Sequence, residues 1–288
     1  MLIAAAHIAL ASTVDLFPDI NEGSLVATIR FHKNSTDESS LYPFISKRCT
    51  NRKRYVKKPI SPHVMKSLIE TPIINGARLH VITQKSEIKK IRCLAARIDA
   101  IIFHHPLLHG GLFKWIRWNK DDILKTRDGL PVDSLELAPP EKIMFRLMSF
   151  WPAMKFMNKF GINKLIGQAN SSLLLHSSAV CIITMNNSNR NDYINGGRYF
   201  ERLWLKATSL GLSLQPFGGL SALLTRVQKA NNEGFSSKQY NTLLSVFDDL
   251  RKICPITENN ALIIAFRIGM ATEPSVRTIR RTIPEFVK

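Results

Sequence analysis

The segment from residue 195 to residue 210 predicts the clearest amphipathic helix in the chain. Its apolar residues recur at intervals of three and four, so they share one helix face, and Gly211 follows as a C-terminal stop. Two short runs, residues 178–185 and 261–268, are apolar and contain β-branched side chains, which is typical of buried strands. We therefore expect helices that pack against buried strands.

The rest of the sequence predicts further elements of both kinds. Ser61 and Pro62 stand in the order that a helix start favours, with serine as the N-cap and proline in the first helical position. Apolar alternation predicts a strand over residues 77–83. Helical spacing predicts one helix over residues 86–103 and another over residues 237–252. The N-terminal part predicts a helix over residues 2–11 and a strand over residues 24–32.

Charge is the most unusual feature of the composition. The 288 residues include 40 lysines and arginines against 22 aspartates and glutamates, a formal net charge of +18. Such a charge favours an anionic partner but does not specify a fold. No apolar run is long enough for a transmembrane helix, so we expect no membrane partner. The four cysteines are far apart and form no C-x-x-C pair, which favours a reducing compartment, the cytoplasm, and argues against a zinc site.

The N-terminus leaves two interpretations open. Residues 1–12 are apolar and rich in small side chains, like the hydrophobic part of a signal peptide, but no basic residue precedes Arg30, so we favour a buried helix. Two pairs of segments also match in the same order of helix and strand: residues 3–10 with 205–212, and residues 25–31 with 262–268. Either the match is chance, or residues 1–40 are the helix-and-strand remnant of a first unit and residues 41–288 form the second.

A basic loop over residues 47–58 holds the first candidate binding residues. Arg48 and Arg52 flank Thr50 at alternate positions, so two guanidinium groups and a hydroxyl group could converge on one phosphate. The alternative is a solvated basic loop.

Two other segments offer groups to the same ligand. Paired glycines after the predicted helix let the backbone approach a flat ligand with its N–H groups exposed, and two adjacent arginines stand in the C-terminal tail. The candidate residues here are Pro216, Phe217, Gly218, Gly219, Arg280 and Arg281. For His104, His105 and His109 we expect packing or surface roles and no metal, because no ordered cysteine or carboxylate accompanies them.

Several ordered motifs resemble FMN-dependent nitroreductases and together cover essentially the whole chain. R-C-T-N-R-K-R-Y at residues 48–55, followed by P-I-S, resembles the R-R-S-x-R-x-F/Y opening of that family. Residues 197–212 resemble the helix before its flavin loop, and residues 266–281 resemble its closing G-x-P…R-R segment. Residues 113–137, with T-R-D-G-L and L-E-L, resemble the duplicated Acg-like nitroreductases, some of which are fused to a ThiF-type adenylating domain. Residues 1–32 are similar to the end of the first half in those proteins, which implies an N-terminally truncated chain.

The resemblance implies an α+β fold in which helices wrap a central mixed, mainly antiparallel sheet. It implies FMN as the cofactor, with its ring beside residues 216–219 and its phosphate held by Arg48, Thr50, Arg52 and Arg280 or Arg281. NAD(P)H would reduce the flavin by hydride transfer, and an electron-poor small molecule would reoxidise it. Because nitroreductases place FMN between two units, the resemblance implies a homodimer or a missing N-terminal half.

The sequence also departs from the family pattern. The A-P-S-x-x-N-x-Q-P-W flavin motif is absent, and residues 71–78 stand in its place without its serine, glutamine and tryptophan. Cys49 replaces the second arginine of the opening motif, and a thiol cannot pair with phosphate as a guanidinium group does. Two alternatives to an enzyme therefore remain. One is a flavin-binding or flavin-sequestering protein of the same fold without turnover. The other is a basic nucleic-acid-binding protein, although the sequence has no RNP-type, helix-turn-helix or zinc pattern.

Overall fold

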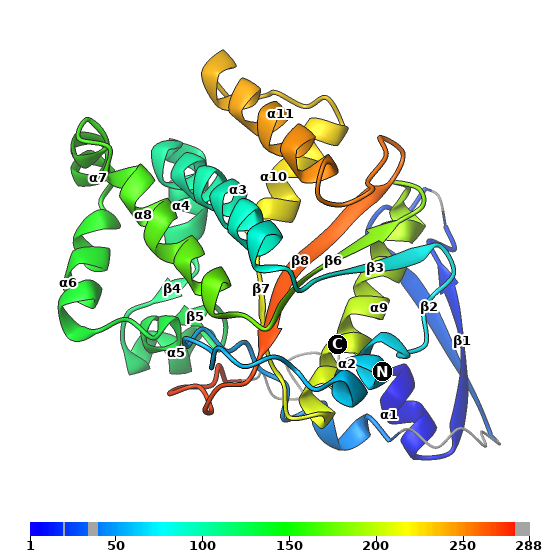
Figure 1. The fold of residues 1–288 in the computed structure, drawn as a ribbon. Coiled ribbons are helices and arrows are strands. Elements are labelled where there is room, and N and C mark those ends of the chain that lie inside the picture. The colour runs from blue at the N-terminus through cyan, green and yellow to red at the C-terminus, as the bar shows by residue number, and fades with distance from the viewer. Residues whose placement is uncertain (20, 34–39, 280–288) are drawn as a thin grey trace.

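A four-stranded antiparallel sheet in the order β3–β6–β8–β7 forms the centre of the computed structural model, which describes residues 1–19, 21–33 and 40–279 (Figure 1). The strands are Ala77–Ile82 (β3), Ala179–Met185 (β6), Ser213–Pro216 (β7) and Ala261–Gly269 (β8). The two inner strands, β6 and β8, are the two apolar runs of the sequence. The prediction that these runs form buried strands is confirmed.

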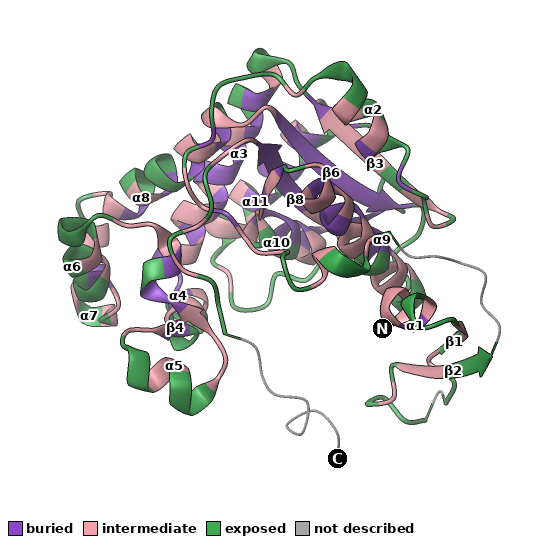
Figure 2. Ribbon diagram, turned by 90° about the horizontal axis from the view of Figure 1, so that it is seen from below, coloured by how far each residue is buried: buried purple, intermediate pink, exposed green. Residues whose placement is uncertain are grey.

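Helices cover both faces of this sheet. On one face lie Pro62–Ile69 (α2) and Arg190–Ser209 (α9); on the other lie Lys85–His104 (α3), Gly218–Gln228 (α10) and Ser237–Arg251 (α11). Alternate residues of β6 enter the two cores, with Val180 and Ile182 facing α3, α10 and α11 and Cys181 and Ile183 facing α2 and α9 (Figure 2). The predicted α+β fold, with a mainly antiparallel sheet wrapped by helices, is confirmed.

Side-chain caps set the starts of two of these helices. The Ser61 hydroxyl accepts a hydrogen bond from the Val64 backbone N–H at 3.4 Å, so α2 begins where its sequence predicts. Helix α9 begins earlier than residue 195, because the Asn189 side chain accepts a hydrogen bond from the Asp192 N–H at 2.9 Å and caps a helix that starts at Arg190.

A smaller helical region lies beside α3 and has its own apolar core. It contains two short parallel strands, Ile116–Arg117 (β4) and Leu130–Pro131 (β5). Its helices are Pro106–Lys114 (α4), Lys120–Thr126 (α5), Pro139–Met148 (α6), Trp151–Asn158 (α7) and Ile162–Ser171 (α8). Phe103, Met148 and Met154 are the buried centre of this region.

The N-terminal segment differs from its prediction. Helix α1 covers Leu2–His7 rather than residues 2–11, and Ala9, with a φ of 58°, separates it from a strand that the sequence did not predict. This strand, Leu10–Leu16 (β1), pairs antiparallel with Ala27–Lys33 (β2). The alanine-rich start suggested a longer helix, whereas the β-branched pair Val14 and Ile29 lie opposite each other in a hairpin.

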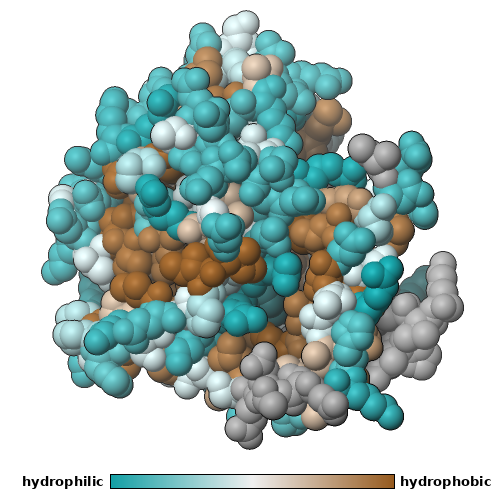
Figure 3. Space-filling view, turned by 90° about the vertical axis from the view of Figure 1, so that its right-hand side faces the viewer, coloured by the Kyte–Doolittle hydropathy of each residue, from teal (hydrophilic) through white to brown (hydrophobic). Residues whose placement is uncertain are grey.

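The hairpin formed by β1 and β2 stands at the edge of the molecule, apart from the main sheet (Figures 1 and 2). The Arg190 guanidinium group lies over the Phe17 ring at 4.2 Å, and the His7 ring stacks on Tyr42 with 3.8 Å between centroids. Figure 3 shows this side of the molecule, where hydrophobic patches lie among hydrophilic side chains. Among the described residues, no helix is both long enough and apolar enough to cross a bilayer.

Candidate functional site

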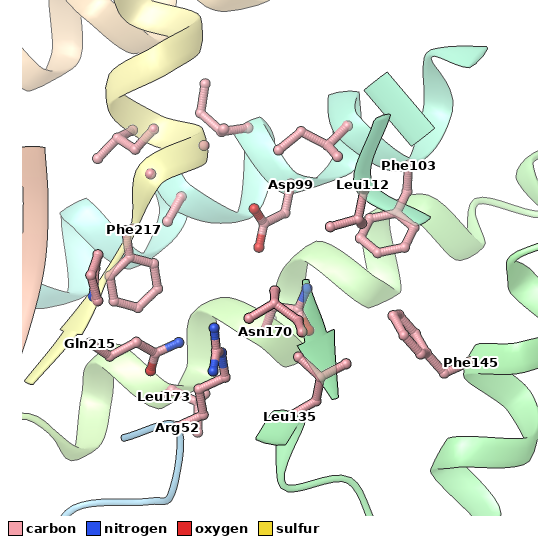
Figure 4. A pocket seen from close by; sticks show the side chains of 18 of the residues that line it. Arg52, Asp99, Phe103, Leu112, Leu135, Phe145, Asn170, Leu173, Gln215 and Phe217 are labelled. Carbon is pink, nitrogen blue, oxygen red and sulfur yellow. The ribbon is translucent and has the colours of Figure 1, made fainter. Parts of the chain in front are cut away.

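A cavity of about 310 Å³ lies between the main sheet and the smaller helical region. Apolar side chains of α3, α4, α6 and residues 130–137 form most of its wall (Figure 4). The polar side chains on the wall come from four separate segments, and they are Arg52, Asp99, Asn170 and Gln215. A mainly apolar cavity with a few converging polar groups is typical of a site for a small organic ligand.

Arg52 is the cation of this cavity, and its loop is held firmly against the sheet. The neighbouring Asn51 is buried, and its side-chain amide donates hydrogen bonds to the Thr272 carbonyl at 2.8 Å and the Ser213 hydroxyl at 3.1 Å. The Arg52 guanidinium group donates to the Ser134 carbonyl at 3.3 Å. Burial lowers the pKa of Arg52 from its usual value, which reflects its partial removal from water.

The glycine segment lies on the cavity wall, as the first turn of a helix rather than as a loop. Pro216 ends β7, and α10 begins at Gly218, directly after Phe217. All four predicted residues of this segment, Pro216, Phe217, Gly218 and Gly219, line the cavity together with Arg52. A Cβ atom on Gly219 would lie 2.9 Å from the Ile102 Cδ1 atom, so a side chain there would crowd α3. The positive end of α10 adds to the attraction for an anionic or electron-rich ligand.

The other predicted phosphate donors lie elsewhere. The Arg48 Nε atom is 2.9 Å from the Glu201 Oε1 atom, and the guanidinium group lies over the Trp204 ring at 4.4 Å, so this side chain packs on α9. Thr50 forms an isolated parallel bridge with Leu214 of β7. Neither residue is among those that line the cavity. Arg280 and Arg281 lie outside the described residues.

A buried arginine that the sequence motifs did not indicate holds two residues of the cavity wall, Gln215 and Leu173. Arg267, in the middle of β8, is 0% exposed. Its guanidinium group donates hydrogen bonds to Gln215 Oε1 at 2.7 Å, Leu173 O at 2.9 Å and Lys53 O at 2.6 Å. Burial lowers the pKa of Arg267 to about 10, so the side chain remains charged at neutral pH. In the sequence, Arg267 could have been recognised as the one arginine within an otherwise apolar predicted strand.

Asp99 is a second cavity residue that the sequence alone did not indicate. It projects from α3 into the cavity, where the Asn170 side chain of α8 hydrogen-bonds to it (Figure 4). Burial raises the pKa of this carboxyl group to about 6, and the hydrogen bond from Asn170 opposes the rise. The available signal was an acidic residue among the apolar positions Ala95, Ile98 and Ile102 of one helix face.

His105 and His109 have packing roles, and His104 is exposed, with its Nδ1 atom 3.4 Å from the Gln239 Nε2 atom. The His105 Nε2 atom is 2.5 Å from the Gly234 carbonyl oxygen, and the His109 Nε2 atom is 2.8 Å from the Met148 carbonyl oxygen. Within residues 1–19, 21–33 and 40–279, no three histidine, cysteine or acidic side chains are grouped as a metal site would require.

No known protein-family profile matches the chain. An uncharacterized protein of Mycobacterium tuberculosis (strain CDC 1551 / Oshkosh), MT1398, is 25% identical over 287 residues. The match takes in 98% of this chain but only 39% of that protein, so the chain spans about two fifths of the length of its relative.

Three solved structures illustrate the fold similarity. The FMN-dependent nitroreductase NfnB from Mycobacterium smegmatis, in complex with NADPH, is 15% identical with a TM-score of 0.48, covering 88% of this chain and 99% of that one. A BluB-like flavoprotein from Clostridium difficile 630 is 12% identical with a TM-score of 0.48, covering 86% and 98%. A nitroreductase with bound FMN from Bacteroides fragilis NCTC 9343 is 12% identical with a TM-score of 0.44, covering 86% and 97%.

Proposed function

We propose that this chain is a flavin-dependent oxidoreductase of the nitroreductase type, which binds FMN in the cavity and passes a hydride from NAD(P)H to an electron-poor small molecule. The observation that carries the proposal is that the cavity joins Arg52 to the backbone of residues 216–219, two segments that the nitroreductase resemblance assigns to FMN. They are far apart in the sequence and lie on one wall.

The cavity residues fit the ring of a flavin. Leu135, Leu173 and Phe217 offer apolar surface to a planar ring, and the start of α10 presents open backbone at Gly218, where nothing lies within 4 Å of an added Cβ atom. Arg52 offers a positive charge to the phosphate or to an electron-rich part of the ring. Bound FMN would supply the redox chemistry, and the protein would supply orientation and electrostatics.

The remaining phosphate donors are part of the proposal. Arg48 would have to leave Glu201 to reach a phosphate, and Thr50 would offer its hydroxyl group from the neighbouring bridge. Arg280 or Arg281 would complete the set. The cavity is built by this chain alone, whereas the nitroreductase resemblance implies a flavin site between two units. A second unit, from a second copy or from a longer protein, would therefore close the flavin site.

Arg52→Ala tests the site directly. Loss of a charged donor to a bound phosphate costs about 1.5–3 kcal/mol, or about ten- to a hundredfold in affinity. In a fluorescence titration we expect FMN to bind more weakly by that factor, whereas riboflavin, which has no phosphate, binds almost as before. Arg54→Ala, in the same loop but with an exposed side chain, is the matched control. Equal losses for FMN and riboflavin would show that Arg52 does not hold the phosphate.

Turnover separates the enzyme from a flavin-binding protein of the same fold. Anaerobic addition of NADH or NADPH to the yellow, flavin-loaded protein should bleach its visible absorbance. A quinone or nitroaromatic compound should then restore the colour. A protein that binds flavin but does not bleach with either nicotinamide would be a carrier or sensor, and a colourless protein would refute the proposal.

A further inference from the structure

The cavity contains an acidic group that the binding of FMN does not require. Asp99 is half-buried on α3, and its carboxyl group points into the cavity toward Asn170 of α8 (Figure 4). The Asp99 Oδ1 atom lies 4.0 Å from the place of a Cβ atom on Gly219, so it sits beside the first turn of α10. An acid in this position adjoins the same turn that lies beside the proposed flavin ring.

The surroundings of Asp99 are unusual for an aspartate because its partner is neutral. Its described hydrogen-bond partner is the side-chain amide of Asn170, and Ile98 and Ile102 lie next to it on the cavity wall. Of the described side chains that line the cavity, Arg52 and Asp99 are the two that ionise. The neighbouring elements contribute the Gly218–Gly219 backbone from α10 and Asn170 from α8, and the described residues of the wall include no histidine, lysine or second carboxyl group.

This environment lets the carboxyl group carry a proton near neutral pH. Burial raises the pKa of Asp99 from 3.8 to about 6. A group whose pKa lies close to the working pH can both hold a proton and release it, which is the condition for general acid catalysis. Asp99 keeps part of its surface exposed to solvent, so the carboxyl group can take up a new proton from water after each transfer.

We infer that Asp99 is the proton donor of this cavity and protonates the electron-poor acceptor as it is reduced, for which a quinone serves as the probe. The inference rests on the proposed function. Reduction of a quinone to its hydroquinone takes up one hydride and one proton. FMN, when bound, would supply the hydride to one carbonyl oxygen of the quinone, which would leave negative charge on the second oxygen. The O–H bond of the Asp99 carboxyl group breaks as its proton moves to that second oxygen, and Asp99 is left as a carboxylate.

The first test measures the proton on Asp99 without turnover. In flavin-loaded protein with ¹³C-labelled aspartate carboxyl groups, we expect one NMR resonance that titrates near pH 6. That resonance should be absent from Asp99→Asn and present in Asp121→Asn, a control in which an exposed aspartate on α5 is changed. The absence of any aspartate that titrates between pH 5 and 7 would overturn the inference.

The second test follows the half-reaction that needs the proton. Reduced protein is mixed rapidly and anaerobically with a water-soluble benzoquinone between pH 5 and pH 8.5. For the original protein we expect the rate to fall above pH 6, as Asp99 loses its proton. For Asp99→Asn we expect a rate at pH 5.5 that is about a hundredfold lower and almost independent of pH, since general acids contribute about 10²–10⁴-fold. Asp121→Asn, the exposed control on α5, should keep the rate and the pH profile of the original protein.

A third variant keeps the carboxyl group and moves its titration. Asn170→Leu removes the hydrogen bond that holds the pKa of Asp99 down, so both the NMR midpoint and the fall in quinone reduction should move to higher pH. A purely structural role of Asp99 would not produce this parallel movement. Unchanged profiles in Asp99→Asn and Asn170→Leu, with flavin still reduced by NAD(P)H, would overturn this inference alone. Failure to bind flavin in the unmodified protein would refute the proposed function and this inference together.

Discussion

The Arg267 guanidinium group lies over the Tyr55 ring, with 3.8 Å between the guanidinium carbon and the ring centroid. The Tyr55 hydroxyl group in turn donates a hydrogen bond to the Asn51 carbonyl at 2.8 Å, within the loop that carries Arg52. A buried cation in β8 therefore holds the basic loop in place. Because Arg267 also binds Gln215 and the Leu173 carbonyl, which lie on the cavity wall, it joins three segments of the candidate site.

Arg267→Met should destabilise the protein strongly. The substitution leaves three part-buried acceptors without their donor, and each such loss costs about 1–3 kcal/mol when the acceptor is kept from water. We expect the free energy of unfolding in urea to fall by about 3 kcal/mol or more, and Arg267→Lys to fall between this variant and the original. Arg54→Met, at an exposed position of the same loop, should change it by less than about 0.5 kcal/mol. A loss of similar size in both methionine variants would show that the buried network contributes little.

The contact between α3 and α8 predicts a second large effect. A Cβ atom on Gly167 would lie 2.2 Å from the Ala96 carbonyl oxygen and 3.2 Å from the Ala100 nitrogen, so both helix backbones would have to move. We expect Gly167→Ala to lower the free energy of unfolding by about 3 kcal/mol. Gly111→Ala, inside α4 with nothing within 4 Å of the added Cβ atom, should instead raise it by up to about 1 kcal/mol. Thermal and urea unfolding of the two variants measure the contrast.

Asp99 should make stability depend on pH in a direction opposite to that of most acids. Its pKa is about 6 in the folded protein and 3.8 in the usual reference state, so the folded state binds the proton more tightly. The contribution of this group therefore lowers the free energy of unfolding by roughly 2–3 kcal/mol as the pH rises from about 4 to about 6. Asp99→Asn removes this loss and should be more stable than the original at pH 7.5, with the advantage disappearing near pH 4. Urea titrations at both pH values check this, and an advantage of equal size at both would contradict it.

Sequence periodicity was sufficient for most of the main sheet and its helices, but it did not predict strand β7 or helix α10. Residues 178–185 and 261–268 are buried on both faces, so their apolar character predicts strands without knowledge of their partners. Strand β1 was missed because its alanine-rich approach resembles a helix and its strand character depends on pairing with β2. Pairing between two strands depends on tertiary structure, so the strand propensity of the residues in β1 alone does not predict it.

The candidate site was predictable only in part for a similar reason. The sequence marks Arg52 and residues 216–219, and the structure brings these together on one wall. Spacing alone placed Arg48 beside Arg52, whereas Glu201 and Trp204 of α9 attract the Arg48 side chain to another surface. Asp99 stands out clearly only when the fold brings Asn170 and the start of α10 against it, because one aspartate on an apolar helix face is a weak indication of function by itself.

The last prediction concerns association through the hairpin. Phe31 is 45% exposed and Val26 is 41% exposed, while Ile8, just before β1, is 65% exposed. These apolar side chains lie in and beside a two-stranded sheet whose strands pair only with each other in the described part of the chain. Unpaired strand edges and exposed apolar groups favour contact with another chain.

We therefore expect light scattering to show a mass that rises with concentration, and Phe31→Lys to suppress the rise. Phe156→Lys is the matched control, because Phe156 is an equally large aromatic residue, 60% exposed, in α7 of the smaller helical region. If the association also completes the proposed flavin site, FMN should increase the mass by mass action in the original protein and less so in Phe31→Lys. A constant monomer mass in the original protein, or association that only Phe156→Lys abolishes, would show that the hairpin is not the contact surface.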